Sequence, residues 1–252
     1  MTSSKILFVE MKEEWQKRHI EERLRGAGEL FFESEKLGDL KAVSAEVTVL
    51  SPFINSPLRA KEFDAFPKLK LIATRSTGYD HIDLAEAAKR GVLVANVPTY
   101  GENTVAEHTF ALILSLSRNL RRAYFKSKQG DFTLDGLMGF DLKGKTLGVI
   151  GTGRIGLHLI HMARGFGLEV LAHDVREDHF MEEVLGFQYV RLDDLLGQSD
   201  ILSLHVPYLP ATHHLINLGN IGKIKKGAIL INTSRGGLVE TEIGRASCRE
   251  RV

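Results

Sequence analysis

The chain has little cysteine, little net charge and no long apolar run. One cysteine in 252 residues cannot build a disulfide framework within the chain and says nothing about the redox compartment. A formal net charge of +1 provides no basic surface for nucleic acid, and no block of like charges forms a binding tail. The N-terminal apolar run is too short, and too soon followed by charges, for a signal peptide or a membrane span. We therefore expect a cytoplasmic protein without nucleic-acid or membrane partners.

The composition is that of an ordinary globular protein. With 43% hydrophobic and 26% charged residues, the chain suits one large or two modest domains. Short β-prone runs alternate with helical segments, which predicts a parallel sheet covered on both faces. Asp83 and Glu86 have the spacing of a capping box, and Gly91 suits the end of the same helix. The strands expected in the first part are 5–9, 29–32, 45–50, 69–74 and 92–95, with a charged helix over 12–25.

A glycine-rich stretch in the middle of the chain predicts a dinucleotide site. A strand-like run over residues 146–150 leads into Gly151, Gly153 and Gly156 and then into a helical pattern that begins near Ile155. Gly151 would permit a tight turn, Gly153 would let the backbone approach a pyrophosphate, and Gly156 would let the helix pack closely on the strand. The N–H groups and partial positive charge of the helix N-terminus would favour the phosphates.

Asp174 strengthens this prediction, because it stands at the end of the next apolar run, residues 168–172. A carboxylate at that place would accept both hydroxyls of the adenosine ribose. It also favours NAD over NADP, since a 2′-phosphate held about 4 Å away would be repelled by roughly 1 to 4 kcal/mol. Arg176 nearby would soften the repulsion. The alternative for Asp174 is a helix cap or a surface turn.

The segments around and after the glycine stretch complete the predicted organisation. Residues 101–120 are apolar over much of a helix surface, and we interpret them as a bridge between domains that also contacts a second subunit. Residues 125–141 are predicted to form an irregular surface arm. A doubly wound domain usually has six strands, so the second sheet is expected to be unfinished. Its later elements are strands over 201–205, 228–233 and 189–190, a helix over 193–198 and a turn or short helix over 219–223.

The last ten residues, 243–252, interrupt a helix that residues 239–242 begin. They resemble the in-frame translation of a common short-read sequencing adapter, and we expect them to be an artefactual tail. The single cysteine, Cys248, lies in this tail. We expect the natural protein to continue beyond residue 242.

Several strings occur together in one order, and they extend the glycine stretch into a family signature. The strings are Arg75-Ser-Thr-Gly-Tyr-Asp-His-Ile-Asp83, Asn96-Val-Pro-Thr-Tyr100, Thr104-Val-Ala-Glu-His108, Gly151-Thr-Gly-Arg-Ile-Gly156, His205-Val-Pro207 and Asn232-Thr-Ser-Arg-Gly-Gly237. With them the chain, over residues 5–241, resembles the D-isomer-specific 2-hydroxyacid dehydrogenases, and Tyr100 after Val97-Pro98 looks most like the D-lactate dehydrogenase branch.

The resemblance implies an α/β fold with two domains. A flavodoxin-like parallel-sheet substrate domain would occupy residues 1–100, and an interdomain helix, also a dimer contact, residues 101–120. A Rossmann NAD-binding domain, truncated at its C-terminus, would occupy residues 121–242, followed by the tail at 243–252. The intact protein would be a homodimer.

The resemblance also implies the site residues. Arg235 would bind the substrate carboxylate and polarise the carbonyl, which suits its planar fork at the carboxyl edge of a strand. The backbone of Ser76, Thr77 and Gly78 would bind the same carboxylate, and Tyr100 would line the substrate pocket, both facing Arg235 across an interdomain cleft. The cofactor would contact Gly151, Gly153, Arg154, Ile155, Gly156, Asp174, Val206, Pro207, Thr212, Thr233, Ser234 and Arg235.

The acid/base pair of the family, a His tuned by a Glu, follows the Arg-Gly-Gly segment and is missing here, so we expect the 252-residue chain to be inactive. Glu107 and His108 cannot form a dyad because helix neighbours point about 100° apart, and His108 is predicted to be packed or interhelical. His81, between two aspartates, suggests a solvated loop rather than a metal site, and no metal is expected. His213-His214 has the same interpretation, and His205 suggests a structural or ribose contact.

The leading prediction is an NAD-dependent enzyme that interconverts D-lactate and pyruvate, since Tyr100 implies a small pocket. Glyoxylate or hydroxypyruvate reductase and a phosphoglycerate dehydrogenase-like enzyme are the alternatives among enzymes. An NAD-sensing corepressor-type binding protein is the alternative from another class. The ordinary charge balance and the lack of a recognition tail argue against the corepressor.

Overall fold

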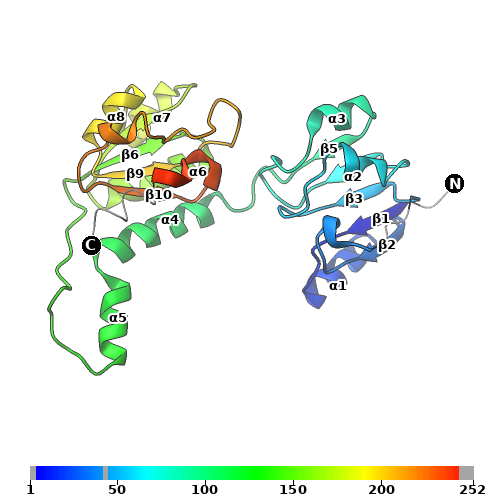
Figure 1. Ribbon diagram of the computed structural model, residues 1–252, viewed down its shortest axis with the longest axis horizontal. Helices are drawn as coiled ribbons and strands as arrows, with labels where there is room; N and C mark the ends of the chain where they lie inside the picture. The colour runs from blue at the N-terminus through cyan, green and yellow to red at the C-terminus, as the bar shows by residue number, and fades with distance from the viewer. Residues whose placement is uncertain (1–3, 42–44, 244–252) are drawn as a thin grey trace. The chain divides into compact units, whose positions relative to one another are not determined.

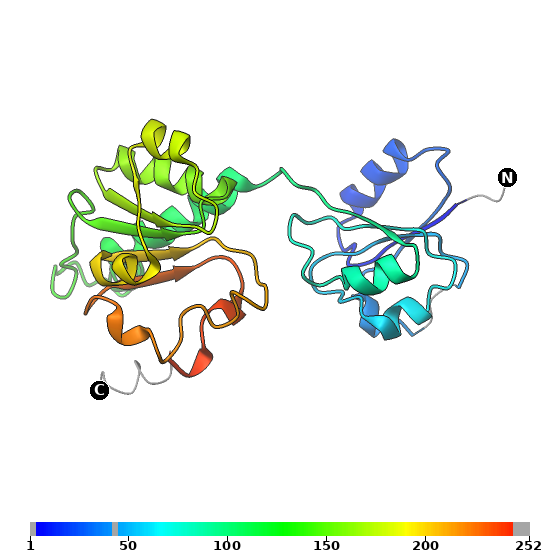
Figure 2. The ribbon, with the colours of Figure 1, turned by 90° about the horizontal axis from the view of Figure 1, so that it is seen from above.

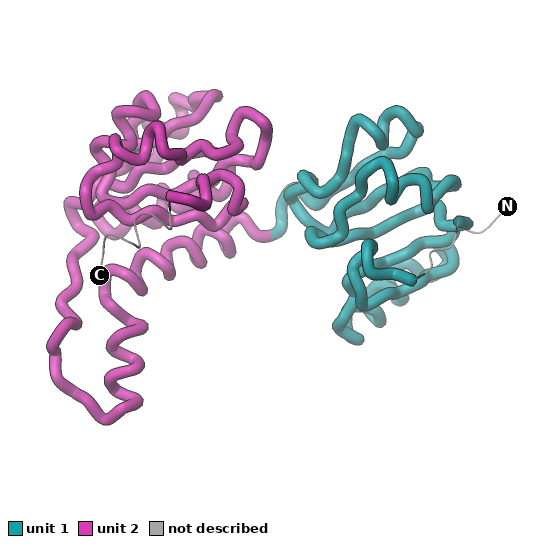
Figure 3. The backbone as a smooth tube through the Cα atoms, viewed as in Figure 1, with its two compact units in different colours: residues 1–100 teal, residues 101–252 magenta. Residues whose placement is uncertain are grey.

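A computed structural model describes residues 4–41 and 45–243 of the chain. It divides into two compact units, Met1–Tyr100 and Gly101–Val252 (Figure 3). That these units have the roles predicted for them, substrate binding and cofactor binding, stays a prediction. No helix in the described part of the chain is long and apolar enough to cross a bilayer.

Unit 1, residues 1–100, is built on a five-stranded parallel sheet with the order β2-β1-β3-β4-β5. This is the flavodoxin-like order, as the family resemblance implied. The strands are β1 (Lys5–Phe8), β2 (Glu29–Phe32), β3 (Val49–Ser51), β4 (Leu71–Ala73) and β5 (Leu93–Ala95), and the helices are α1 (Glu14–Arg23), α2 (Ala60–Asp64) and α3 (Leu84–Lys89), with a 3-10 turn η1 (Leu37–Asp39).

The side chains of β1 show why this sheet carries helices on both faces. Leu7 and Val9 join the cluster that contains residues of α2 and α3, whereas Ile6 and Phe8 join the cluster that contains α1. Successive side chains of a strand point to opposite faces, so an apolar run without alternation needs a cover on each side. These helices are labelled in Figure 1, and the view of Figure 2 shows α1 on one side of the strands and α2 and α3 on the other.

Unit 2, residues 101–252, carries a second five-stranded parallel sheet with the order β10-β9-β6-β7-β8. Numbered within the unit and read from the β8 edge, this is 3-2-1-4-5, the order of the first five strands of a doubly wound domain. The strands are β6 (Thr146–Ile150), β7 (Glu169–His173), β8 (Gln188–Tyr189), β9 (Ile201–Leu204) and β10 (Ile229–Asn232), and the helices are α4 (Glu102–Ser117), α5 (Leu120–Lys128), α6 (Arg154–Gly165), α7 (His179–Leu185) and α8 (Leu192–Gln198), with 3-10 turns η2 (Ile221–Lys223) and η3 (Gly236–Leu238).

Two apolar layers enclose this sheet. Helices α4 and α6 contribute Phe110, Ile113 and Leu159 to the layer on one face, and α8 contributes Leu195 and Leu196 to the layer on the other. Figure 2 shows helices on both sides of these strands. Strands β6 and β9 lie in the middle of the sheet and are almost fully buried, which is why they read as continuous apolar runs in the sequence.

Two predictions about the segment after residue 100 were wrong in detail. The helix expected over 101–120 ends at Ser117, and the arm expected to be irregular from residue 125 is helical to Lys128, as α5. The break comes at Asn119, which has a left-handed φ of 51° and donates its side-chain amide to the carbonyl of Met138. Asparagine tolerates this conformation better than most residues, so it ends one helix and starts the next at an angle.

The prediction about the C-terminal tail falls almost entirely outside the described residues, since residues 244–252 are not described. A helix does begin before the tail, but at Thr241 rather than Val239, and it includes Ile243, where the sequence predicted an interruption. Ile243, the first residue assigned to the tail, is buried at 6% exposure with Ile216 and Leu238.

Candidate functional site

The order of the strands in unit 2 reverses beside β6, with β7 on one side and β9 on the other. In open α/β sheets, ligands bind at the carboxyl ends of the strands at such a reversal. The loops that meet here follow β6 and β9. A Cβ on Gly151 would lie only 2.6 Å from the carbonyl oxygen of His205, so the two loops are in contact at this point.

The three glycines that follow β6, two in the loop and Gly156 in α6, are each required for a different structural reason or for none within the protein. Gly151 has a left-handed φ of 99°, and its N–H donates to the carbonyl of His173 over 2.9 Å. A Cβ on Gly156 would come within 2.1 Å of the Gly151 carbonyl oxygen, so only glycine lets α6 pack this closely. A Cβ on Gly153 would meet no atom within 4 Å. The protein's own packing therefore explains Gly151 and Gly156, whereas Gly153 faces open space.

That open space lies at the N-terminus of α6. Gly153 occupies the N-cap position and provides no side-chain cap, and the first turn contains no acidic residue. The free N–H groups and partial positive charge at the N-terminus of a twelve-residue helix are suited to an anion. Arg154 adds a largely exposed guanidinium, whose Nη1 lies 3.2 Å from Glu102 Oε1. Ile155 packs against the core and holds the helix start in place.

Asp174, at the end of β7, is held against the glycine loop. Its Oδ2 accepts the N–H of Thr152 over 2.7 Å and the Thr152 hydroxyl over 3.2 Å, and its Oδ1 accepts the N–H of Arg176 over 3.0 Å. Burial by itself would raise the pKa of Asp174, but these hydrogen bonds and one from the Val175 N–H outweigh burial and lower the pKa below its ordinary value. The carboxylate is therefore charged at neutral pH and fits a ribose diol.

The loop after β9 contains the other residues predicted to lie beside the cofactor. The Thr212 hydroxyl donates to the carbonyl of Pro207 over 2.6 Å and accepts the N–H of Leu209 over 2.8 Å, so it closes a turn of this loop. Val206 follows His205 and packs partly against the core. A direct contact of Val206, Pro207 or Thr212 with a cofactor stays a prediction.

His205 is a partly buried residue that follows β9, at the carboxyl edge of the sheet. Its Nε2 lies 2.8 Å from the Ser203 hydroxyl, and its Nδ1 is buried without a hydrogen-bond partner among the described residues. Burial lowers the pKa of His205 to about 4, so the imidazole is neutral at neutral pH. A neutral, buried ring favours the structural interpretation of His205 over an acid/base role.

Arg235 follows β10 and is positioned by its neighbours. Asn232 accepts the N–H of Ser234 over 3.0 Å and donates its amide to the carbonyl of Arg235 over 2.8 Å, which fixes the turn. The Ser234 hydroxyl donates to the carbonyl of Leu204 over 2.8 Å and ties the turn to β9. Thr233 shares a hydrogen bond of 2.9 Å with Thr109 of α4. The hydroxyls of Thr233 and Ser234 are thus both bonded within unit 2.

In unit 1, the loop predicted to bind a carboxylate follows β4. The Ser76 side chain is buried and donates to the carbonyl of Gly78 over 2.7 Å, so this hydroxyl shapes the loop itself. The Thr77 hydroxyl donates to the carbonyl of Val97 over 2.9 Å, and the Asn96 amide donates to the carbonyl of Thr77 over 2.8 Å. Tyr100 is 61% exposed. The substrate roles of these residues stay predictions.

Two interpretations of histidines were wrong. His81 is not a solvated loop residue, because it is buried at 6% exposure with its Nε2 3.2 Å from the Thr74 hydroxyl. His108 is not packed between helices but exposed on α4. The sequence signal for His81 was misleading because its two aspartate neighbours are polar while the ring itself turns toward the core. No group of three metal-ligating side chains occurs in residues 4–41 and 45–243.

Sequence reasoning did not find three residues that shape the site. Asn232 fixes the turn that carries Arg235, and its place in the Asn-Thr-Ser-Arg string was a usable signal. Thr152 binds Asp174, and its position between two site glycines was a weak signal. Tyr189 lies 2.8 Å from the Thr152 hydroxyl, and nothing in the sequence near Tyr189 pointed to the site.

Comparison with known proteins agrees with this geometry. Residues 110–243 match the family model of the D-isomer specific 2-hydroxyacid dehydrogenase, NAD binding domain. The chain is 47% identical over 174 residues to D-lactate dehydrogenase kk1H of Curvularia clavata, covering 69% of this chain and 49% of the relative. It is 39% identical over 196 residues to the glyoxylate reductase of Korarchaeum cryptofilum, covering 76% of this chain and 59% of the relative. The chain thus spans about half to three fifths of the length of these two relatives.

A solved structure matches both units. The D-lactate dehydrogenase of Aquifex aeolicus, complexed with NAD and lactic acid, has a TM-score of 0.90 and 38% identity, and the match covers 97% of this chain and 73% of that one. The matching family model is that of an NAD binding domain, and the open helix N-terminus at Gly153 and the charged Asp174 are compatible with NAD. The chain therefore belongs to the D-isomer specific 2-hydroxyacid dehydrogenase family.

Proposed function

We propose that the protein is an NAD-dependent oxidoreductase that interconverts a D-2-hydroxy acid and the corresponding 2-oxo acid, with D-lactate and pyruvate as substrates. The proposal rests on the geometry of the loop after β6. Gly153 leaves open space at the N-terminus of α6, and the Asp174 carboxylate is held beside the same loop, where it could accept the hydroxyls of a ribose. The relatives named D-lactate dehydrogenase support the choice of substrate.

Each site residue of this chain would have a separate role in binding the cofactor or the substrate. NAD, when bound, accepts or supplies the hydride. The first turn of α6 and Arg154 would hold the pyrophosphate, and Asp174 would hold the adenosine ribose. Arg235 would pair with the substrate carboxylate through two parallel N–H···O bonds and draw charge toward the carbonyl oxygen. The backbone of residues 76–78 and the ring of Tyr100 would complete substrate binding.

We assign no described residue as the acid/base group that would transfer the proton of the reaction. A His–Glu pair is present, with His179 Nδ1 2.7 Å from Glu182 Oε2, but it lies on α7 beside the loop of Asp174. Strands β7 and β10 are three positions apart in the sheet, or roughly 14 Å at the usual spacing, so this pair does not face Arg235. We therefore expect the 252-residue chain alone to bind NAD without turning over substrate. NADH oxidation by the purified chain with pyruvate would contradict this.

The substrate is tested with the full-length gene product. Steady-state rates with pyruvate, glyoxylate, hydroxypyruvate and phenylpyruvate are compared at equal NADH. We expect the highest kcat/KM with pyruvate. A second candidate is a glyoxylate or hydroxypyruvate reductase, which the similarity to a glyoxylate reductase favours. A preference for glyoxylate, hydroxypyruvate or a bulky 2-oxo acid would overturn the lactate assignment. A phosphoglycerate dehydrogenase-like substrate or a corepressor-type role has no specific observation in its favour.

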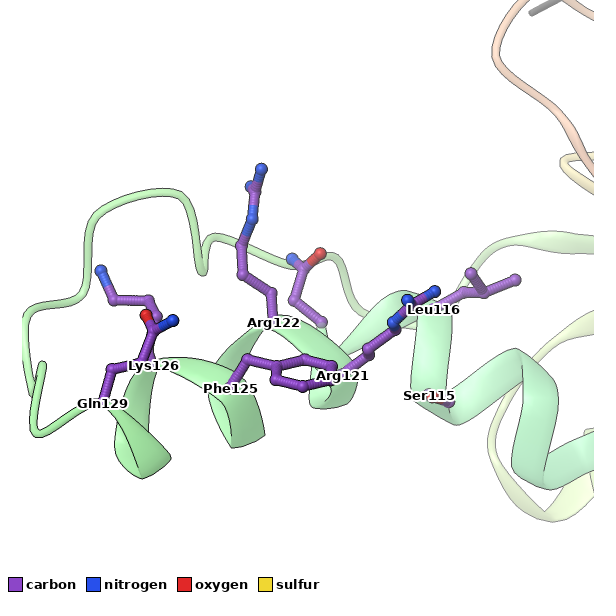
Figure 4. Close-up of a pocket in the computed structure, with 8 residues that line it drawn as sticks. Ser115, Leu116, Arg121, Arg122, Phe125, Lys126 and Gln129 are labelled. Atoms are coloured by element: carbon purple, nitrogen blue, oxygen red, sulfur yellow. The ribbon is translucent and has the colours of Figure 1, made fainter.

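A homodimer is proposed on the surface of α4 and α5. The segment carries several apolar side chains that are about half exposed, among them Leu116, Leu120 and Phe125. A shallow cavity of about 550 Å³ lies on this surface. Figure 4 shows Leu116, Arg121 and Phe125 among the residues that line it. Exposed apolar patches of this kind on a helical arm are typical of subunit contacts. Sedimentation of the full-length protein and of Phe125→Glu tests the proposal, with a dimer expected only for the unsubstituted chain. The expected cytoplasmic location stays a prediction.

A further inference from the structure

Three side chains from separate segments of unit 2 form a connected chain of hydrogen bonds, which we call the hydroxyl relay: Tyr189 of β8, Thr152 of the glycine loop and Asp174 after β7. The Tyr189 hydroxyl lies 2.8 Å from the Thr152 hydroxyl, and the Thr152 hydroxyl lies 3.2 Å from Asp174 Oδ2. The relay thus connects an edge strand to the carboxylate predicted to bind ribose.

The direction of each hydrogen bond in the relay follows from the groups present. An ionised carboxylate only accepts, so the single proton of the Thr152 hydroxyl points to Asp174. Thr152 must then accept from Tyr189, whose own proton is used in that bond. The Tyr189 oxygen in turn accepts the N–H of Asp178 over 3.2 Å. Every donor in the relay has one acceptor, which leaves a single consistent arrangement.

The Tyr189 ring is held in place independently of the relay. Phe187 contacts it edge-on at a centroid distance of 5.0 Å, and His179 does so at 5.9 Å. The Tyr189 N–H donates to Glu182 Oε1 over 2.9 Å. The second carboxylate oxygen of Glu182 pairs with His179. Tyr189 is therefore a fixed point from which the loop can be positioned.

The loop between β7 and α7, residues 174–178, is attached to the relay at both ends. Thr152 holds Asp174 at the start of the loop, and Tyr189 holds the N–H of Asp178 at its end. Asp178 also caps α7 by accepting the N–H of Met181 over 3.1 Å. Between the two attachments the loop is exposed, and Val175 is fully so. Without the Tyr189 hydroxyl, one end of the loop and the side-chain hydrogen bond to Asp174 would both be weakened.

We propose that Tyr189 is a positioning residue which, through Thr152, holds the Asp174 carboxylate in the orientation that accepts the adenosine ribose diol and rejects a 2′-phosphate. The proposal rests on the proposed use of NAD. A fixed carboxylate accepts two hydroxyls with good geometry but repels a phosphate at the same place. A carboxylate that can rotate away loses part of both effects, so the relay raises NAD affinity and NADP discrimination together.

The test uses the 252-residue chain and measures dissociation constants for NADH and NADPH by calorimetry. Tyr189→Phe removes only the hydroxyl. We expect about three- to tenfold weaker NADH binding, the usual range for one lost hydrogen bond, and a smaller ratio of NADH to NADPH affinity. Thr152→Val should behave like Tyr189→Phe, and Thr152→Ser, which keeps a hydroxyl, should remain near the unsubstituted chain. Tyr124→Phe, on α5, removes a hydroxyl outside the relay and should change neither constant.

A double-mutant cycle separates positioning from general stability. If Tyr189 acts through Asp174, then Tyr189→Phe should have no further effect on NADH binding in an Asp174→Asn background. An equal loss in both backgrounds, or unchanged affinity and an unchanged NADH to NADPH ratio in Tyr189→Phe, would overturn the proposal. Failure of the proposed function would look different, because the unsubstituted chain itself would then bind no NADH or would prefer NADPH. Circular dichroism of each variant confirms that it is folded.

Discussion

The two units share an architecture but differ where their first strand ends. In unit 1, β1 is followed by Glu10 with a left-handed φ of 60°, and in unit 2, β6 is followed by Gly151 with a φ of 99°. Both residues stand where the strand order of a parallel sheet reverses, the place where ligands bind in such sheets. Each unit thus has a left-handed residue shortly after the first strand of its sheet, Glu10 two residues beyond β1 and Gly151 directly after β6. We call these places the turn of unit 1, which carries a charged side chain, and the turn of unit 2, which carries none.

The side chain decides what the turn can do. Glu10 accepts the Ser56 hydroxyl over 2.6 Å and the Asn55 amide over 3.0 Å, so protein groups occupy the position. In unit 2, the glycine loop leaves open space beside Gly153 and presents a helix N-terminus to it. Only the second turn offers an anion site. The shared fold thus determines where a site can lie, and the residues of the loop determine what that site can bind.

The largest effect is expected from one methyl group added to unit 2 at Gly156, where α6 packs on the turn of unit 2. In Gly156→Ala, the Cβ would lie 2.1 Å from the Gly151 carbonyl oxygen, so helix and loop must separate. We expect unit 2 to lose about 3 kcal/mol or more of its free energy of unfolding and NADH binding to disappear. Gly165→Ala is the control on the same helix, because its Cβ meets nothing within 4 Å and alanine favours helix. Equal melting curves for both variants would contradict the close-packing argument.

Acid should lower the free energy of unfolding of unit 2, relative to that of unit 1, by a similar amount. The folded pKa of His205 is about 4, below the ordinary value of 6.5, so the unfolded chain takes up a proton that the folded chain does not. The free energy of unfolding of unit 2 is therefore complete above pH 6.5 and falls as the pH drops from 6.5 to about 4, by about 3 kcal/mol in total.

This acid effect is measured by urea unfolding at several pH values. The only tryptophan, Trp15, lies in α1 and reports unit 1, while NADH binding reports unit 2. His205→Gln should flatten the loss for unit 2 over this pH range and leave the tryptophan signal unchanged. An equally steep loss in His205→Gln would assign the acid sensitivity to other groups.

A third substitution should affect the ligand without affecting the fold. In Gly153→Ala, the new Cβ meets no protein atom within 4 Å but enters the space at the N-terminus of α6. We expect an unchanged melting temperature and NADH binding weaker by about tenfold or more, since a pyrophosphate needs that space. Calorimetry with NADH measures the affinity. Normal NADH binding in this variant would show that the cofactor does not approach Gly153.

The smallest effect is expected from the turn of unit 1. Glu10→Ala removes the acceptor of two hydrogen bonds and leaves a side chain in a left-handed conformation, so unit 1 should lose about 1–2 kcal/mol. Glu10→Gly removes the same bonds but suits the positive φ, and it should lose less. NADH affinity should be the same in both. A change in NADH affinity would mean that this turn also has a role in cofactor binding.

Much of this fold could be predicted from short-range patterns. The apolar runs of β6 and β9 and the glycine spacing were readable because a buried parallel strand and a dinucleotide turn each need a particular residue type. The break at Asn119 was missed because the hydrogen bond from its side chain to Met138 joins residues far apart in sequence. The link from Tyr189 to Thr152 was missed for the same reason. The burial of His81 was missed because its polar neighbours Asp80 and Asp83 suggested a solvated loop. Tertiary contacts decide such details, and one sequence does not show them.

The contacts that close the glycine loop also have a kinetic consequence. Gly151 donates to His173, and Gly156 touches the Gly151 carbonyl, so the protein's own backbone sets the shape of the loop before any cofactor arrives. We therefore expect that the loop does not have to become ordered when a dinucleotide binds, so that the association rate depends on diffusion and charge rather than on a conformational step. Substitutions around this loop that leave the fold intact should therefore act on the residence time of the cofactor, through faster dissociation.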